Sequence, residues 1–260
     1  MPTGRLWLIP NLIAPGRPED ALPGSTLAAI RGTRRFVVEG EKAAWRLLST
    51  LLDREALAAT TLDVLDEHSL AEALPGLLAP ALAGEDLGLL SEAGMPCVAD
   101  PGAALVALAH DRGLRVIPLP GPSSIILALA ASGLDGQRFR FLGYLPQDRE
   151  GRRNALREID KGIRSDGATR IFIETPYRNA QLLADCLDSL SASTRLCVAR
   201  SLGSETEQIR SAPVSGWKIS PMEIGKVPAI FLAGRVPSPP PVSSHQGRDG
   251  ARPRNRPAKR

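Results

Sequence analysis

The chain has 260 residues, enough for one large domain or two small ones, and its 43% hydrophobic and 23% charged residues are typical of a globular protein. Aromatic residues make up 4%, which argues against a protein that binds single-stranded nucleic acid through many stacked bases. The three cysteines and three histidines are too few to favour a disulfide framework, a metal site or a histidine-based catalytic triad. The net charge of +4 comes from the C-terminal end: the residues beyond Arg235 hold six of the 32 basic residues and one of the 28 acidic ones, so the remainder has a charge of −1.

Short aliphatic runs alternate with helix-like stretches through the first half of the chain. Helices are predicted at residues 41–52 and 69–83, and a third at residues 101–112, with Asp100 as its N-cap and Pro101 as its first residue. This alternation predicts an α/β sheet with parallel strands. The predicted strands of this half are residues 5–9, 35–38, 62–65, 87–90 and 114–118.

The uncharged run of residues 116–134 has nearly the length of a membrane span. The sequence PLPGPSS interrupts its middle, so it is better read as a strand, a loop and a helix that begins at Ser123 or Ser124 and ends near Gly133. No signal-peptide cleavage pattern follows the apolar N-terminal residues. We therefore expect a soluble cytoplasmic protein without a membrane span.

The second half alternates less strictly, and we place a domain boundary near Pro120. A charged helix is predicted at residues 149–163 and an amphipathic one at residues 178–190. The predicted organisation is an N-terminal α/β lobe (residues 1–120), a C-terminal α/β lobe (121–235) and a disordered tail (236–260). The predicted strands of this half are residues 138–142, 170–174, 195–199 and 227–233.

The tail is rich in proline, serine, glycine and arginine and has almost no apolar residues, so it cannot form a core. It is either a solubilising segment or a basic arm that attracts the phosphates of RNA.

Two glycine- and proline-rich turns follow predicted strands: SEAGMP…ADPG at residues 91–102 and PLPGPSS at residues 118–124. Both lie where open α/β sheets place their ligands, and glycine lets the backbone approach a ligand closely. GxGxxG, GxxxxGK[ST] and GxSxG motifs are absent, so dinucleotide, P-loop and covalent hydrolase sites lack their usual loops.

Residues 87–134 (LGLLSEAGMPCVADPG through PLPGPSSIILALAASGL) closely resemble the tetrapyrrole methylase superfamily of S-adenosylmethionine-dependent methyltransferases. Within it they are most similar to the branch that 2′-O-methylates a cytidine ribose in small-subunit ribosomal RNA. The resemblance continues through FRFLGYLP, the KGRR-like GRR at residues 151–153, TRIFIETPYR and the closing AIFLAG, and covers residues 87–234 well.

The resemblance implies two α/β lobes, each a mixed sheet flanked by helices, with S-adenosylmethionine in the cleft between them, in a homodimer that acts on ribosomal RNA or the small ribosomal subunit. The strand-end turns supply backbone groups that suit such a ligand, and methyl transfer depends mainly on positioning the acceptor. The family pattern assigns the cofactor to residues at the two turns and at the first and last strands: Pro10, Asp100, Ala103, Ser123, Ser124 and Pro228.

The N-terminal third departs from the rRNA-branch pattern, since IPN and EGEK replace its PIGN and acidic-Thr-Arg loops and SEAGMP replaces SDAGTP. A ribose hydroxyl would gain from a general base. Glu92 and Glu174 at strand ends are the catalytic candidates; either could instead be a solvated acid or a partner of an arginine. Glu39 and Glu41 are weaker candidates.

Three functions stay open at the level of the sequence. The first is RNA ribose methylation, which the rRNA-branch resemblance and the basic tail favour. The second is methylation of a tetrapyrrole or another small molecule, which the charge of −1 outside the tail favours. The third is a non-catalytic cofactor- or RNA-binding protein, suggested by the altered N-terminal loops.

Overall fold

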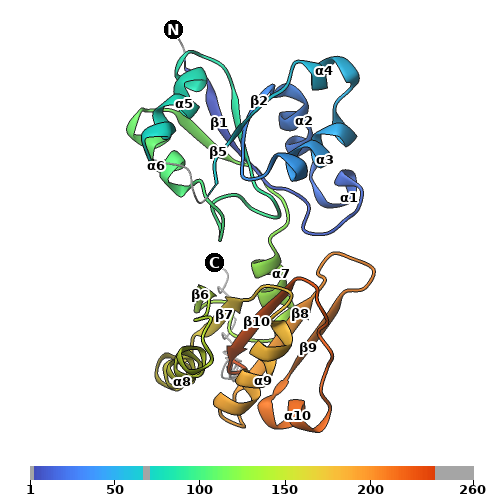
Figure 1. The fold of residues 1–260 in the computed structure, drawn as a ribbon, viewed down its shortest axis with the longest axis vertical. Helices are drawn as coiled ribbons and strands as arrows, with labels where there is room; N and C mark the ends of the chain where they lie inside the picture. The colour runs from blue at the N-terminus through green and yellow to red at the C-terminus, as the bar shows by residue number, and fades with distance from the viewer. Residues whose placement is uncertain (1–2, 67–70, 238–260) are drawn as a thin grey trace, which may run out of the picture.

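A computed structural model describes residues 3–66 and 71–237. Each of its two lobes is built on one five-stranded sheet, and the lobes lie one above the other in Figure 1. Pro120, where we predict the boundary between the lobes, lies between the last strand of the first sheet and the helix that opens the second lobe. Residues 238–260, which make up most of the predicted tail, lie outside the described residues.

The first lobe is a parallel sheet covered on both faces. Its strand order is β3-β2-β4-β1-β5, and every pairing in it is parallel, because helices separate each strand from the next. The strands are β1 (Arg5–Ile9), β2 (Arg35–Val38), β3 (Thr61–Val64), β4 (Leu87–Leu90) and β5 (Arg115–Pro118). The helices are α1 (Pro18–Ala21), α2 (Gly24–Gly32), α3 (Glu41–Leu51), α4 (Arg54–Ala58), the 3₁₀ turn η1 (Ala71–Ala73), α5 (Leu74–Leu82) and α6 (Ala103–Asp111).

Alternate residues of β2 show how the sheet is covered. Phe36 and Val38 are buried against α2 and α3, whereas Val37 is buried against α5 and α6 on the other face. Strands buried on both faces read as continuous aliphatic runs, which is the pattern found in the sequence.

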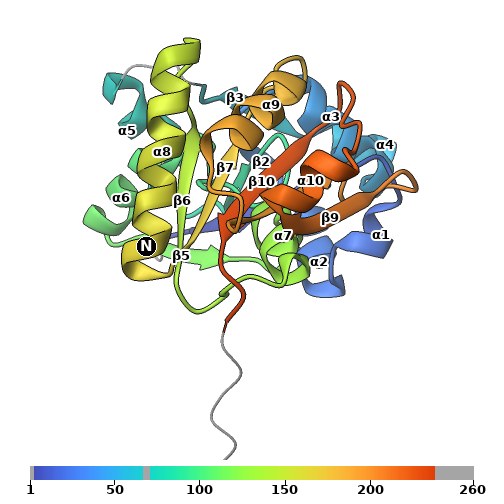
Figure 2. The same ribbon diagram turned by 90° about the horizontal axis from the view of Figure 1, so that it is seen from below.

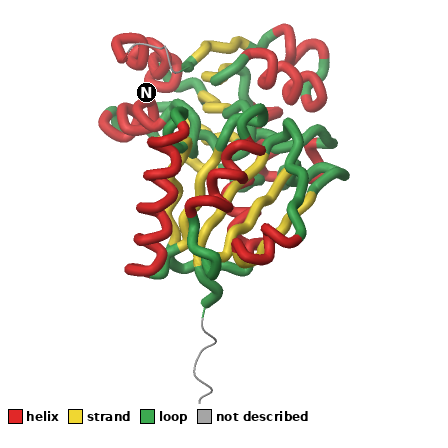
Figure 3. The backbone as a smooth tube through the Cα atoms, turned by 60° about the horizontal axis from the view of Figure 1, so that its bottom comes forward, coloured by secondary structure: helices red, strands yellow, loops and turns green. Residues whose placement is uncertain are grey.

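The second lobe has a mixed sheet of order β6-β7-β10-β8-β9, in which only the β6–β7 pair is parallel. Helices α8, α9 and α10 cover one face, in front of the yellow strands in Figure 3 and of β7 and β10 in Figure 2, and α7 covers the other. The strands are β6 (Phe139–Tyr144), β7 (Thr169–Ile173), β8 (Arg195–Arg200), β9 (Gln208–Pro213) and β10 (Ala229–Gly234). The helices are α7 (Ser124–Ser132), α8 (Arg149–Asp166), α9 (Asn179–Ser189) and α10 (Val214–Ile219).

The core of the second lobe is centred on three large side chains. Phe172 of β7 stacks on Phe231 of β10 with ring centroids 5.9 Å apart. Trp217 of α10 is fully buried and its indole N–H donates to the main-chain oxygen of Leu196 at 2.8 Å, so its one polar atom is satisfied.

Most predicted elements are present, with bounds that differ by a few residues, and the prediction of a two-lobed α/β fold is confirmed. The first sheet is parallel throughout rather than mixed. The short helices α1, α2, α4 and α10 and the edge strand β9 are present in the structure and were not predicted from the sequence.

Candidate functional site

The candidate site lies at the edge of the first sheet that faces the second lobe (Figure 1). All strands of a parallel sheet end at the same edge, so the residues that follow them meet there. Because β4 lies between β2 and β1, Glu39 after β2, the loop after β4 and Asn11 after β1 become neighbours.

Asn11 joins the loops that follow β1 and β4. Its main chain exchanges two hydrogen bonds with Gly94, of 2.9 and 3.1 Å. Its buried side-chain amide donates to the main-chain oxygens of Ser91 at 3.0 Å and Glu92 at 3.1 Å, and its Oδ1 accepts from the N–H of Leu12 at 2.8 Å. Sequence reasoning saw this residue only as part of an altered PIGN turn and assigned it no role.

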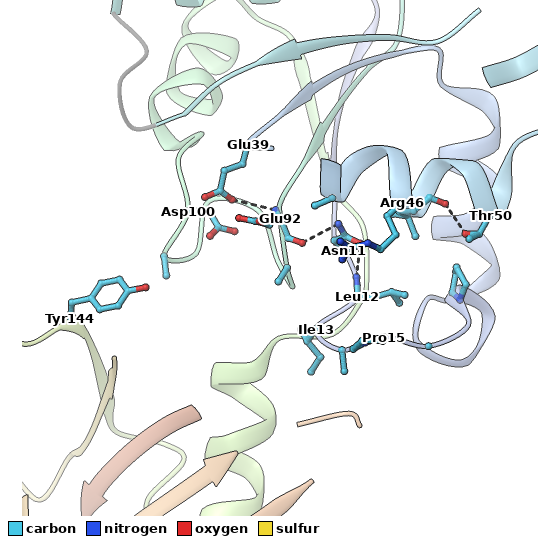
Figure 4. Close-up of a pocket in the computed structure, with 17 residues that line it drawn as sticks. Asn11, Leu12, Ile13, Pro15, Glu39, Arg46, Thr50, Glu92, Asp100 and Tyr144 are labelled. Carbon is cyan, nitrogen blue, oxygen red and sulfur yellow. Dashed lines mark hydrogen bonds between the residues drawn. The ribbon is translucent and has the colours of Figure 1, made fainter. Parts of the chain in front are cut away.

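Three carboxylates gather on this edge: Glu39, Glu92 and Asp100 (Figure 4). The main-chain N–H of Glu92 donates to Oε2 of Glu39 at 3.2 Å. Oδ2 of Asp100 is buried without a hydrogen-bond partner. Burial, reinforced by the negative charges of Glu39 and Glu92, raises the pKa of Asp100 to about 7.

Asp100 does not cap a helix, so that prediction is wrong. Helix α6 begins at Ala103, its N-cap is Gly102 with a φ of 124°, and no side chain caps it. Cys97 and Ala99 also have positive φ angles, 66° and 65°, which residues with side chains rarely adopt. The loop after β4 therefore continues two residues further than predicted and leaves the Asp100 carboxylate among the two other acids instead of at the start of α6.

A cavity of about 670 Å³ opens beside the three carboxylates. Its other walls come from the loop after β1, from α3 and from Tyr144 at the end of β6, which among the described residues is the one that the second lobe contributes (Figure 4). We call it the first cavity. It is lined by Asn11, Leu12, Ile13, Ala14, Pro15, Gly16, Pro18, Glu39, Ala43, Arg46, Leu47, Thr50, Glu92, Ala93, Ala99, Asp100 and Tyr144.

A second cavity of about 570 Å³ adjoins the first and shares Ile13, Ala14, Pro15, Ala93 and Tyr144 with it. It lies between the lobes, at the ends of β7 and β8 and the start of β10, and it combines apolar walls with several hydroxyl groups. Its remaining lining residues are Ser124, Ile173, Glu174, Thr175, Pro176, Ala199, Ser201, Leu202, Ser204, Thr206, Pro228, Ala229 and Ile230.

Glu174 is the buried acid of the second cavity, with a side chain only 1% exposed. Its Oε1 accepts from the N–H of Thr175 at 2.7 Å and from Nε and Nη2 of Arg178 at 3.0 and 2.7 Å. Its Oε2 has no hydrogen-bond partner. A buried carboxylate oxygen left open in this way can accept a hydrogen bond from a ligand.

The predicted site residues are divided between the two cavities. Asp100 and Glu92 line the first, whereas Ser124, Pro228 and Glu174 line the second. Three further predicted residues line neither cavity: Pro10 and Ser123, which lie in neighbouring loops, and Ala103, which is the first residue of α6.

Pro10 holds the second glycine turn in place. A Cβ atom on Gly121 would lie 2.2 Å from Cγ of Pro10, so the loop after β5 can pack on the loop after β1 only because residue 121 has no side chain. Ser123 is the N-cap of α7, although its hydroxyl makes no capping hydrogen bond.

Sequence reasoning missed Arg46 and Thr50 of α3 and assigned no role to Tyr144. Arg46 and Thr50 stand in an ordinary amphipathic helix, where the residue pattern gives no sign of a site. Tyr144 lies within the FRFLGYLP segment that resembles the family. An aromatic residue next to a glycine just after the end of a predicted strand could have indicated a ligand contact there.

The family profile of Tetrapyrrole (Corrin/Porphyrin) Methylases matches residues 18–216. The chain belongs to the tetrapyrrole methylase family. Among solved structures, a methyltransferase named CobJ superposes with a TM-score of 0.60 at 19% identity, covering 90% of this chain and 95% of its own. A conserved hypothetical protein of Aeropyrum pernix K1 superposes with a TM-score of 0.64 at 19% identity, covering 91% and 86%. At these identities the structures show the shared fold.

Relatives with curated names support the finer resemblance within the tetrapyrrole methylase family. The protein named ribosomal RNA small subunit methyltransferase I of Pseudomonas aeruginosa is 34% identical over 83% of this chain and 72% of its own length. The proteins of the same name from Mesorhizobium japonicum and Escherichia coli O157:H7 are each 39% identical, over 64% and 58% of this chain. These two matches span 55% and 51% of the relatives' lengths. The predicted family membership and the similarity to the rRNA branch are confirmed.

Two further findings concern residues 3–66 and 71–237. No helix there has the length and apolar character needed to cross a membrane. In the same residues, no group of three or more histidine, cysteine, aspartate or glutamate side chains could hold a metal ion.

Proposed function

We propose that the protein is an S-adenosylmethionine-dependent methyltransferase that methylates a ribose 2′-hydroxyl of small-subunit ribosomal RNA. The observation that carries this proposal is the pair of adjoining cavities at the strand ends of a tetrapyrrole methylase fold, one suited to a cofactor and the other to an acceptor. The names of the 34–39% identical relatives supply the substrate class.

The second cavity fits S-adenosylmethionine. Its volume and its apolar walls with a few polar groups are those of a site for a nucleoside-sized ligand. The open Oε2 of Glu174 offers an acceptor for a ribose hydroxyl or an amino group of such a ligand. Ser124 and Pro228, both from the second lobe, would contact the cofactor, and Asp100 of the adjoining first cavity is proposed to complete its site. The cofactor, when bound, supplies a methyl group activated by a positively charged sulfur.

The first cavity is the proposed acceptor site, and Glu92 is the proposed general base. Its carboxylate lines this cavity, close to the wall shared with the second one, so it can take the proton of an acceptor hydroxyl held at the junction. The hydrogen bonds between Asn11 and the loop after β4 fix the main chain that carries Glu92. The residues thus orient the acceptor and receive one proton, which is the assistance that methyl transfer from an activated donor requires.

The proposed function also includes an oligomeric state and a cellular compartment. By the family resemblance we infer a homodimer, which sedimentation equilibrium of the full chain tests. A substrate in the small ribosomal subunit places the proposed activity in the cytoplasm.

The decisive experiment is methyl transfer from radiolabelled S-adenosylmethionine to small subunits purified from a strain that lacks this gene. We expect label in the RNA, recovered as a 2′-O-methyl nucleoside after nuclease digestion and mass spectrometry. Glu92→Gln should lower the rate by about 10²- to 10⁴-fold, the usual range for loss of a general base. Glu55→Gln, on the exposed helix α4, is the matched control and should be fully active. Label in an added tetrapyrrole but none in RNA would overturn the proposed substrate.

A further inference from the structure

The first cavity has an uneven distribution of charge. Its acidic end carries Glu39, Glu92 and Asp100, whereas Arg46 is the only cation that residues 3–66 and 71–237 contribute to its lining (Figure 4). Tyr144 faces the acidic end from the second lobe (Figure 4). A ligand with one anionic and one neutral end therefore has a single favourable direction in this cavity.

Helix α3 fixes the position of the cation. Ala43, Arg46, Leu47 and Thr50 all line the cavity, and their spacing of three and four residues places them on one face of the helix. Leu47 is 3% exposed and anchors that face in the core of the first lobe. The Arg46 side chain makes no hydrogen bond or ion pair with any of the residues that the structure describes, so its guanidinium is available to a ligand.

Tyr144 contributes an aromatic surface at the junction of the two cavities. Its side chain lines both of them, yet the residue is 60% exposed. Single-stranded RNA is commonly bound by stacking of a splayed-out base on such an exposed ring.

We infer that the first cavity binds the acceptor as one splayed-out nucleotide of single-stranded RNA, with Arg46 on its phosphate and the Tyr144 ring on its base. The inference rests on the proposed function and assigns the residues that orient its substrate. A phosphate placed at the other end of the cavity would meet the carboxylates of Glu39 and Glu92, joined by that of Asp100 when it is ionised, and their repulsion disfavours the reversed direction. In the favoured direction the ribose lies between base and phosphate, on the side of Glu92.

The test is fluorescence anisotropy with a short labelled single-stranded RNA of small-subunit sequence, titrated with the full chain at several salt concentrations. Arg46→Ala should weaken binding about tenfold at low salt and reduce the slope of log affinity against log salt by about 0.7, the loss of one phosphate contact. Arg46→Lys should keep the slope, because it keeps the charge. Arg112→Ala is the matched control: Arg112 follows α6 at the opposite edge of the first sheet and is exposed.

Tyr144 is tested by two substitutions that separate the ring from its hydroxyl. Tyr144→Leu should weaken RNA binding about 5- to 150-fold at every salt concentration without changing the slope, since stacking is not an ionic contact. Tyr144→Phe should bind as the wild type does. Calorimetry with S-adenosylhomocysteine should give an unchanged affinity for Arg46→Ala, whose side chain lies outside the second cavity.

The outcomes distinguish this inference from the proposed function. A wild-type slope and affinity for Arg46→Ala, in a protein whose wild type methylates RNA, would overturn the inference and leave the proposed function intact. RNA binding that Tyr144→Leu does not weaken would overturn the stacking part in the same way. A wild type that neither binds nor methylates RNA would overturn both.

Discussion

Asn11 and Gly94 pair their main chains across two loops that lie more than 80 residues apart in the sequence, with N–H···O distances of 2.9 and 3.1 Å. The Asn11 side chain reinforces this pairing by donating to the main-chain oxygens of Ser91 and Glu92. Both proposed sites depend on the loop after β4, so a single buried amide positions the acid edge of the first cavity.

Asn11→Ala should destabilise the fold by about 1–3 kcal/mol, because it leaves buried main-chain groups without their hydrogen-bond partner. Urea unfolding measures this cost. Asn154→Ala is the matched control, since Asn154 is exposed on α8, and it should change the free energy of unfolding by less than about 0.5 kcal/mol. Equal stability of the two variants would show that the loops hold their positions without the Asn11 amide.

Gly121→Ala should destabilise the protein, because the added Cβ would lie 2.2 Å from Cγ of the rigid Pro10 ring. Overpacking of this kind costs about 1–3 kcal/mol. Gly136→Ala is the control, since a Cβ at that glycine meets nothing within 4 Å. Thermal unfolding of the two variants should differ by several degrees, and equal melting temperatures would mean that the strand-end loops can separate without cost.

Most helices and strands could be predicted because the order of apolar and polar residues along the chain follows the burial of each element. Strands covered on both faces, such as β2 (RFVV) and β4 (LGLL), appear as short runs dominated by apolar residues, without the alternation of polar and apolar residues seen in half-exposed strands. Strand β9 could not be found in this way: it is a partly exposed edge strand of mixed residues, and its conformation comes from six register pairs with β8. The short helices α1 and α4 have too few residues to show a period.

The sequence predicted mainly those site residues that are acidic or lie in the glycine-rich turns, and it did not predict those that helix α3 contributes. The two glycine turns predicted the strand-end loops, and Glu92 and Asp100 line the first cavity. The helix cap assigned to Asp100 failed because Gly102 adopts a positive φ and delays the start of α6 to Ala103. Arg46 enters the site through the packing of α3 on the sheet, which a single helical period cannot reveal.

Arg178→Met should strongly destabilise the second lobe, because it leaves the carboxylate of Glu174, 1% exposed, without its cation. Removing one partner of a buried ion pair typically costs about 3–5 kcal/mol. The double variant Arg178→Met with Glu174→Gln should recover part of this loss, since it removes the uncompensated charge. Chemical unfolding of the two single variants and the double variant measures the coupling. Additive effects would show that the pair contributes little beyond its separate contacts.

The raised pKa of Asp100 predicts a dependence of stability on pH. The folded-state pKa is about 7, whereas the ordinary value is 3.8. Between these values the folded protein keeps a proton that the unfolded chain releases, so the stabilisation linked to this proton is complete below about pH 4 and is lost as the pH rises through 7. The free energy of unfolding of the wild type, measured in urea at pH 5, 6, 7 and 8, should therefore fall relative to that of Asp100→Asn, which carries no titrating group. The affinity of the wild type for RNA, measured without the cofactor, should also fall as the pH rises through 7. The reason is that ionised Asp100 adds a third negative charge beside Glu39 and Glu92 in the acceptor cavity. Parallel stability curves for the wild type and Asp100→Asn from pH 5 to pH 8 would contradict a protonated Asp100 at neutral pH. In that case the RNA affinity of the two proteins should also depend on pH in the same way near pH 7.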